Sequence, residues 1–219
     1  MKIDVLTIFP AMFGGVLRES IIGRAADKGL VKIKIHDLRD WTEDVHKSVD
    51  APPFGGGAGM VMRVDVIDKA VKDLKQENSR VILMDTKGDV YKQSKARELS
   101  KLGHFILIVP HYEGVDHRVQ SHIADEVISL GNFVLTGGEI PAMAIVDSVV
   151  RLIPGVLGNE ESLIEESFGD DDSCVIEYPQ YTRPAEYKSW KVPEILLSGD
   201  HKKIKQWREM NRTKEEDVR

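Results

Sequence analysis

The chain has a single cysteine, Cys174, among its 219 residues. One thiol cannot form an intrachain disulfide, and a thiolate metal site needs several ligands at close spacing, so we expect neither. No apolar run approaches the roughly 20 residues that a membrane-spanning helix requires. Met1-Lys2 leads straight into the strand-like segment Ile3–Phe9 without a cleavable signal, so the sequence predicts a cytoplasmic protein.

The sequence also lacks the patterns that are typical of a catalytic zinc site and of a serine hydrolase. The seven histidines show no spacing of the His-x-x-x-His type, so we expect no catalytic zinc and no metal site. Ser48, Ser121 and Ser148 lack the context of a nucleophile elbow, which leaves hydrolase chemistry without support. Whether Mg²⁺ assists a reaction stays open at this stage.

Charge is distributed unevenly along the chain, whose formal net charge is −6. Residues 1–154 contain 20 basic and 21 acidic side chains, residues 155–182 contain none and 8, and residues 183–219 contain 10 and 7. An acidic connector therefore precedes a basic tail, KKIKQWR at residues 202–208. A solvated helix face explains this tail on its own, but such a patch also suits phosphate groups.

Short apolar segments rich in β-branched residues alternate with amphipathic helical patterns. This alternation predicts an α/β fold with a parallel sheet. The stretch 155–182 interrupts every periodic pattern, so we expect a domain boundary there and a small helical unit after it. Strands are expected at residues 3–9, 31–35, 81–84, 105–109 and 126–130, and helices at 11–27, 64–76, 92–101, 115–122 and 139–152.

The segment Asp50–Met60, DAPPFGGGAGM, has four glycines within five residues. Glycines at this density are unfavourable unless the backbone needs their conformations or a ligand approaches closely. The segment is entered through two prolines rather than a strand, unlike a dinucleotide-binding fingerprint, and it lacks the Gly-Lys-Ser/Thr ending of a P-loop. A flexible surface turn is one interpretation, but we favour a loop that holds a planar ligand.

Two further glycine turns lie near the ends of predicted strands. The segment 130–139, LGNFVLTGGE, is expected to place a strand between turns whose backbone groups can hydrogen-bond the edge of an adenine. The turn HYEG at 111–114 ends the predicted strand at 105–109. Ligands of open α/β sheets gather at such carboxyl ends, so we expect the two turns to form one pocket.

Arg151 closes the last predicted helix before the acidic stretch 155–182, and the carboxylates Glu165 and Glu166 follow shortly after it. On their own these residues fit ordinary roles better than catalytic ones. An arginine at a helix C-terminus complements the helix dipole, and the carboxylates suit a solvated connector.

Eight segments, in order along the chain, together resemble the bacterial tRNA (guanine-N1)-methyltransferases of the knotted SPOUT class. No single glycine turn is specific, but the combination is. The segments are TIFP at 7–10, the stretch 39–50, PFGGGAGM at 53–60, YEGVD at 112–116, VLTGGEIPAM at 134–143, RLIPGVLG at 151–158, EYP with YTRP between 177 and 184, and LLSG at 196–199.

The resemblance implies an α/β domain with a deep trefoil knot, a rare exception to the rule that chains do not thread their own loops. It implies a knotted catalytic domain over 1–158, an acidic flexible connector over 159–182 and a small helical tRNA-binding domain over 183–219. It also implies a homodimer whose active sites are shared between subunits. The implied reaction is methyl transfer from S-adenosylmethionine to N1 of the guanine immediately 3′ of the anticodon in tRNA.

The knot of such a protein would bind the cofactor, largely through backbone groups. Pro110-His111 stands where the family has Gly-Arg, which removes one backbone donor near the cofactor. By position, the resemblance implies that S-adenosylmethionine contacts Met84, Asp85, Thr86, Pro110, Tyr112, Glu113, Gly114, Leu130, Gly131, Asn132, Phe133, Val134, Leu135, Gly137, Gly138 and Pro141.

Guanine N1 is protonated at neutral pH, so its methylation needs a base to remove the proton. As the proton leaves, negative charge grows on O6, where a guanidinium would stabilise the transition state. Arg151 matches the family's catalytic arginine. Glu166 corresponds to the base, where the family commonly has aspartate before Ser-Phe, and Asp170–Asp172 are its rivals.

For the substrate, the resemblance implies that the glycine-rich loop lies against the target guanine after that base flips out, while the basic tail holds phosphates. The residues expected to contact RNA are Asp50, Gly55, Gly56, Gly57, Gly59, Glu177, Arg183, Lys202, Lys203 and Arg208. Two alternatives remain: a knotted enzyme that methylates a ribose hydroxyl of another RNA, and an RNA-binding homologue that has lost activity.

Overall fold

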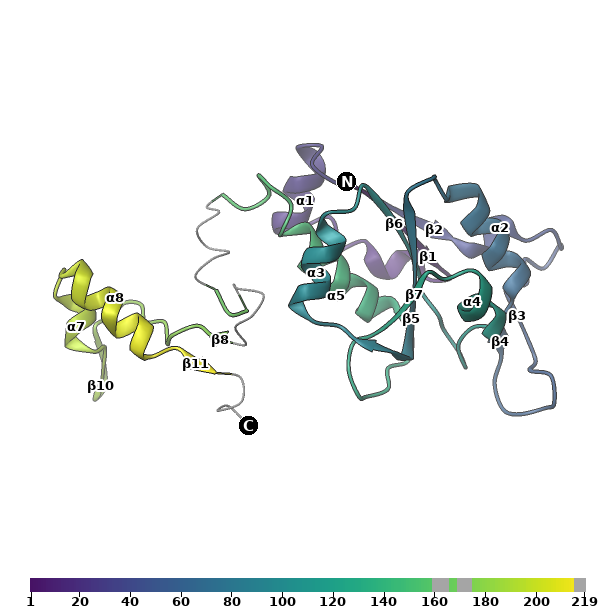
Figure 1. Ribbon diagram of the computed structural model, residues 1–219. Helices are drawn as coiled ribbons and strands as arrows, with labels where there is room; N and C mark the ends of the chain where they lie inside the picture. The colour runs from purple at the N-terminus through teal and green to yellow at the C-terminus, as the bar shows by residue number, and fades with distance from the viewer. Residues whose placement is uncertain (159–165, 169–174, 215–219) are drawn as a thin grey trace. The chain divides into compact units, whose positions relative to one another are not determined.

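The computed structural model describes residues 1–158, 166–168 and 175–214. The chain divides into two compact units, Met1–Gly158 and Asn159–Arg219 (Figure 1). Within the described part of the chain, no helix has both the length and the apolar character needed to cross a membrane. The expected connector lies largely outside the described residues and stays a prediction.

The first unit is built on a five-stranded sheet. Its strand order is β2-β1-β6-β5-β7, and every neighbouring pair is parallel. All five expected strands are present, so the prediction of an α/β fold with a parallel sheet is confirmed. The strands are β1 (Lys2–Thr7), β2 (Lys32–Asp37), β5 (Ser79–Val90), β6 (His104–Ile108) and β7 (Glu126–Ser129).

Helices cover both faces of this sheet, as Figure 1 shows. In β6, Phe105 and Leu107 belong to one apolar core, while Ile106 and Ile108 belong to the other. Because both faces of β6 are buried, this strand reads as a nearly continuous apolar run, HFILI. One core contains α1 (Ser20–Asp27), α3 (Gln93–Ser100) and α5 (Glu139–Val150), and the other contains α2 (Val64–Leu74) and α4 (His117–His122).

The segment 11–27 does not form the single helix that its pattern predicts. It forms a 3-10 helix, η1 (Pro10–Phe13), followed by α1, which begins at Ser20. Gly14 and Gly15 separate the two pieces, and glycine is among the least favourable residues inside a helix. Ser20 has a φ of 54°, which interrupts the right-handed backbone at that residue.

Residues 130–138 form a loop, so the strand expected within the segment 130–139 is wrong. The loop connects β7 to α5 and makes one isolated antiparallel bridge, between His111 and Gly137. Phe133 and Val134 are 53% and 86% exposed, so this stretch lacks the burial that its apolar sequence suggested.

A short antiparallel pair closes the base of the glycine-rich loop. β3 (Asp50–Ala51) pairs with β4 (Val61–Met62), so the chain returns to its starting point after the loop. A second 3-10 helix, η2 (Leu38–Trp41), follows β2 and packs near α2.

A buried polar cluster lies within the sheet. Asp4 of β1 is fully buried, and its carboxylate lies 2.8 Å from Nε2 of both His36 and His104 and 2.6 Å from Nζ of Lys2. Burial alone would raise the pKa of Asp4, but its three partners outweigh that effect and hold this pKa well below its usual value. Two of the seven histidines thus support the core of the fold.

The described residues of the second unit, 166–168 and 175–214, form two helices and two short strand pairs, of which the sequence predicted only the helical part. Trp207 packs against Tyr178 and Tyr181, with ring centroids 6.5 and 6.3 Å apart. The Arg208 guanidinium lies 4.9 Å from the centre of the Tyr178 ring. The elements are β8 (Val175–Ile176) with β11 (Thr213–Lys214), β9 (Glu186–Tyr187) with β10 (Trp190–Lys191), α7 (Glu194–Leu197) and α8 (His201–Met210).

Candidate functional site

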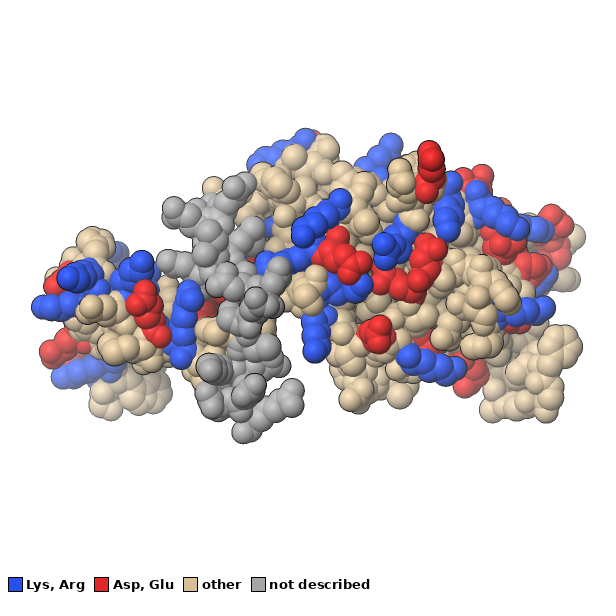
Figure 2. Space-filling model, viewed as in Figure 1, with Lys and Arg blue, Asp and Glu red and all other residues tan. Residues whose placement is uncertain are grey.

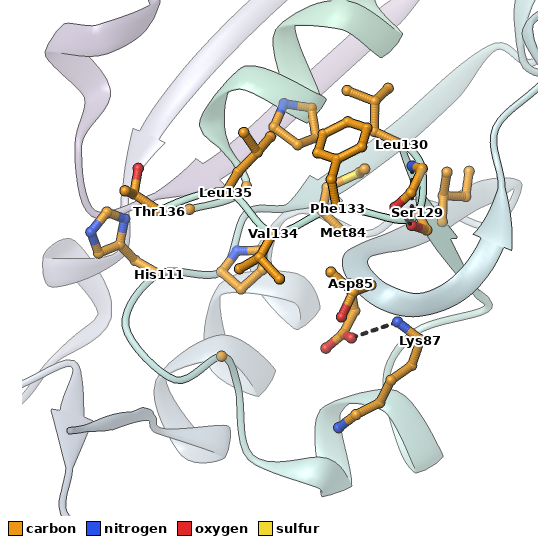
Figure 3. A pocket seen from close by; sticks show the side chains of 18 of the residues that line it. Met84, Asp85, Lys87, His111, Ser129, Leu130, Phe133, Val134, Leu135 and Thr136 are labelled. Atoms are coloured by element: carbon orange, nitrogen blue, oxygen red, sulfur yellow. Dashed lines mark hydrogen bonds between the residues drawn. The ribbon is translucent and has the colours of Figure 1, made fainter. Parts of the chain in front are cut away.

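A cavity of about 280 Å³ lies at the carboxyl ends of β5, β6 and β7. Residues from three loops line it: 84–87 in the irregular part of β5, 110–114 after β6, and 128–141 from the end of β7 into α5 (Figure 3). Both glycine turns that the sequence singled out therefore line the same cavity. Ligands of open α/β sheets bind at this edge.

The structure gathers fifteen of the sixteen residues expected to bind the cofactor around this cavity; the exception is Asn132. Their role in cofactor binding stays a prediction. The cavity also has lining residues that the sequence did not predict, and most of them are next in the chain to a predicted one. Extending each predicted loop by one or two residues would have found most of them. The missed residues are Lys87, His111, Ile128, Ser129 and Thr136.

The cavity has an apolar part and a charged part. Figure 3 shows Leu130 and Phe133 together, with Asp85 and Lys87 in another part of the cavity. The Asp85 carboxylate accepts a hydrogen bond of 2.9 Å from the Lys87 backbone N–H. Gly131 makes room for the aromatic ring, because a Cβ there would lie 2.7 Å from a Phe133 ring carbon. Such a pocket suits a flat, largely apolar group with a few polar atoms.

A buried carboxylate supports the wall that His111 forms. Glu139 is only 2% exposed; Thr7 donates a 3.3 Å hydrogen bond to its Oε1, and its Oε2 lies 3.4 Å from Nδ1 of His111. Gly137 passes so close to Glu139 and His111 that a Cβ there would collide with both. Glycine at residue 137 is therefore required by close packing.

An excursion of β5 shapes the other side of the cavity. Met84 and Asp89 align with the same residue of β7, so residues 85–88 loop out of the ladder. Gly88 lets the chain return, because a Cβ there would lie 2.5 Å from the Val127 carbonyl oxygen. The irregularity brings side chains of residues 85–87 into the cavity lining.

The glycine-rich loop adjoins the cavity. The Glu113 backbone N–H donates a 3.0 Å hydrogen bond to the Met60 carbonyl, and a Cβ at Gly59 would lie 2.5 Å from Cγ of Glu113. All four glycines in 55–59 have positive φ, from 77° to 136°, which glycine adopts without the usual steric cost. Phe54, at the start of the loop, is fully exposed. The loop expected to meet the target base thus lies beside the cavity expected to hold the cofactor.

Arg151 is at the opposite end of α5 from the cavity. Pro141, in the first turn of α5, lines the cavity, whereas Arg151 is the C-cap residue. At about 1.5 Å per residue, the two lie about 15 Å apart along the helix axis. Arg151 is not among the residues that line its own chain's cavity.

The remaining predicted residues lie in the second unit, except for Asp50 in β3. Glu166 is partly exposed, whereas Glu165 and Asp170–Asp172 lie outside the described residues. Of the expected RNA contacts in this unit, Glu177, Arg183, Lys202 and Lys203 are exposed, and Arg208 is half-buried.

Comparison with known proteins bears on both units. A family model described as tRNA (Guanine-1)-methyltransferase TrmD matches residues 1–219. This chain belongs to that family. The resemblance expected from the sequence motifs is therefore confirmed.

Curated relatives named tRNA (guanine-N(1)-)-methyltransferase extend along nearly the whole chain. The protein of Dictyoglomus turgidum is 57% identical over 208 residues, which cover 95% of this chain and 83% of that protein. The protein of Geobacillus kaustophilus is 52% identical over 211 residues, covering 95% and 85%. The protein of Staphylococcus epidermidis is 50% identical over 209 residues, covering 95% and 84%.

Proposed function

We propose that this chain transfers a methyl group from S-adenosylmethionine to N1 of the guanine immediately 3′ of the anticodon in tRNA. One observation carries the proposal. A member of the tRNA (guanine-N1)-methyltransferase family has a cavity at its strand ends, and fifteen residues that family resemblance assigns to the cofactor line it. The names of its relatives support the same reaction.

The chemistry of the cavity lining fits the methyl donor. Leu130 and Phe133 offer an apolar surface to the adenine ring, and the backbone of the glycine turn at 137–138 offers polar groups to its edge. Asp85 and Glu113 also line the cavity, and carboxylates favour a positively charged ligand. When bound, S-adenosylmethionine supplies an electrophilic methyl group on a positively charged sulfur.

Glu166 is the general base in this proposal. It takes the proton from guanine N1, which leaves the N1 electron pair available to accept the methyl group. Glutamate keeps the carboxylate of the family's usual aspartate and lengthens the side chain by one methylene. Arg151 donates hydrogen bonds to O6 and stabilises the negative charge that grows there as the proton leaves.

A homodimer supplies the arginine to each cavity. Arg151 lies at the far end of α5 from Pro141, so the guanidinium at a given cavity comes from the other copy. Phe133 and Val134 leave an apolar surface beside the cavity, and a second subunit covers it in this proposal.

The glycine-rich loop holds the target base in this proposal. Phe54 is fully exposed at the start of this loop, and an aromatic ring there can stack on a flipped-out base or its neighbour. Asp50, half-buried in β3, contacts the base edge, while Arg183, Lys202 and Lys203 contact phosphates. Glu177 and Arg208 complete the predicted RNA surface.

Two further parts of the proposal follow from the family resemblance. The loops around the cavity belong to a deep trefoil knot, and the enzyme acts on tRNA in the cytoplasm.

The test is methyl transfer from labelled S-adenosylmethionine to an unmodified tRNA transcript, with and without Mg²⁺, and with primer extension to map the product. We expect a block at the guanine 3′ of the anticodon, and none with a control transcript that has adenine there. Glu166→Gln should bind the cofactor with unchanged affinity but lose transfer. A fully active Glu166→Gln enzyme would pass the role of base to Asp170–Asp172.

The same assay separates the alternatives. An RNase-resistant label at a ribose 2′-oxygen would identify the ribose-methylating enzyme instead. Cofactor and tRNA binding without any transfer would identify an inactive RNA-binding homologue. Each of these results would overturn the proposed reaction.

A further inference from the structure

The hairpin of β9 and β10 presents two aromatic rings to solvent. Tyr187 and Trp190 are directly paired across the hairpin, and only residues 188–189 lie between them in the chain. Their ring centroids are 5.8 Å apart, and the side chains are 55% and 68% exposed. Large aromatic side chains at such exposure are candidates for contact with a partner.

A lysine lies over both rings. Nζ of Lys188 is 5.5 Å from the centre of the Tyr187 ring and 5.6 Å from that of Trp190, within the range of a cation–π interaction. Lys188 has a φ of 58°, a left-handed conformation that glycine or asparagine adopts more easily. The turn therefore accepts an unfavourable backbone conformation at the residue that places a positive charge beside two exposed rings.

The second unit is basic in its described part. Residues 175–214 contain nine lysines and arginines against five aspartates and glutamates, in a chain whose net charge is −6. On the face drawn in Figure 2, basic side chains are spread over the unit that contains α8, with acidic and uncharged residues between them. Exposed aromatic rings in a positively charged setting are typical of surfaces that stack unpaired nucleobases.

We propose that the aromatic hairpin, residues 187–190, is a stacking platform for an unpaired base of tRNA other than the target guanine. The base lies against Trp190, the more exposed of the two rings, and the Lys188 ammonium moves to pair with a neighbouring phosphate. The proposal rests on the proposed function, because it takes tRNA as the ligand. The hairpin is a binding site that is separate from the cavity at the ends of β5, β6 and β7.

The first experiment compares the affinity of full-length variants for the tRNA transcript. Trp190→Ala should raise the dissociation constant by roughly 5- to 150-fold, the range for loss of one stacked base. Trp190→Phe keeps a ring and should recover most of the affinity. Met210→Ala is the matched control, because Met210 is also an exposed, large apolar residue of the second unit but lies outside the hairpin. It should leave the affinity unchanged.

Salt dependence distinguishes the aromatic residue from the lysine. Lys188→Gln should reduce the slope of log affinity against log salt by about 0.7–0.9, the value for one phosphate contact. Trp190→Ala should leave that slope unchanged, because stacking releases no counterions. For a fully paired RNA duplex used as the probe, Trp190→Ala and wild-type proteins should have equal affinity.

Three outcomes would overturn the proposal. Equal tRNA affinity of Trp190→Ala and Met210→Ala proteins would show that the ring makes no contact with tRNA. A loss of affinity for duplex equal to that for tRNA would exclude an unpaired base. A change in oligomeric state of Trp190→Ala, measured by sedimentation, would make the hairpin an interface between protein chains.

Failure of this inference is distinguishable from failure of the proposed function. If wild-type protein methylates tRNA but the hairpin variants bind it normally, only the stacking platform is wrong. If wild-type protein neither binds nor methylates tRNA, both are wrong. Because Trp190 is mostly exposed, its replacement should leave the thermal unfolding midpoint unchanged, which separates a binding defect from misfolding.

Discussion

Replacing Gly59 by alanine tests the connection between the glycine-rich loop and the cavity. Gly59 has a φ of 77°, and the added Cβ would lie 2.5 Å from Cγ of Glu113. The left-handed backbone conformation costs an alanine about 1–2 kcal/mol. The Glu113 side chain must also leave the position in which it lines the cavity. We expect lower stability together with weaker binding of S-adenosylmethionine.

Gly29→Ala is the matched control for this change. Gly29 has a φ of 72°, but no atom lies within 4 Å of the added Cβ, so the same backbone cost arises without a collision. Both variants should lose about 1–2 kcal/mol of unfolding free energy, which lowers the midpoint of thermal unfolding by roughly 2–8 °C in a chain of this size.

Isothermal titration calorimetry with S-adenosylmethionine separates the two variants. Gly59→Ala should raise the dissociation constant by roughly 2- to 10-fold, the loss of about one hydrogen bond, whereas Gly29→Ala should leave it unchanged. In a Glu113→Ala background, the change at Gly59 should have no further effect on binding. Equal dissociation constants for the Gly59→Ala and Gly29→Ala proteins would refute the reasoning.

Three more predictions concern the core and the dimer. Asp4→Asn should lower the free energy of unfolding at neutral pH by about 3–5 kcal/mol, because it breaks a buried ionic cluster. Since the pKa of Asp4 is depressed in the folded protein, the Asp4 carboxylate stabilises the fold above about pH 4, and this stabilisation is lost as the pH falls further. The urea unfolding curves of wild type and Asp4→Asn should therefore converge as the pH falls below about 4. Burial raises the pKa of Tyr91 to about 12 despite its hydrogen bond to Ser148, so the free energy of unfolding should fall as the pH rises from about 10 towards that value. In urea unfolding curves, Tyr91→Phe should remove the part of this decrease that comes from Tyr91. Arg151→Ala and Gly138→Val chains should each be inactive when expressed alone. Their co-expression should restore about a quarter of wild-type methyl transfer, because half of the randomly formed dimers contain one intact site out of two. No recovery of methyl transfer would mean that each cavity uses its own chain's arginine.

The sheet was predictable because its physical signal is local. The strand β6 is buried on both faces, with Phe105 in one core and Ile106 in the other, so its apolar run could be recognised directly in the sequence. The break at Ser20 and the loop at 130–138 were not predictable in this way. The apolar pattern of 11–27 looks helical in spite of Gly14 and Gly15, and the apolar residues of 130–139 look strand-like although Phe133 and Val134 are exposed.

The cavity was only partly accessible to sequence reasoning. The glycine turns marked two of its three loops, because close backbone approach at Gly137 leaves no room for a side chain. The β5 excursion depends on pairing with β7, which the sequence of residues 84–89 does not reveal. In the proposed homodimer, Arg151 serves the cavity of the other copy, because α5 separates it from Pro141 and the cavity of its own chain. The sequence of a single chain does not reveal such an arrangement.

The departure from the family pattern at residues 110–111 is accommodated by its surroundings. Pro110 lacks an N–H, but its carbonyl accepts a 2.8 Å hydrogen bond from Gly138, and its Cδ lies 2.7 Å from where a Cβ at residue 138 would be. The proline thereby adds a reason for glycine at residue 138. His111 gives the buried Glu139 carboxylate a second partner besides Thr7. Pro110 and His111 are thus closely fitted to their neighbours in the cavity wall. This fit favours an active enzyme over a homologue that has lost its activity.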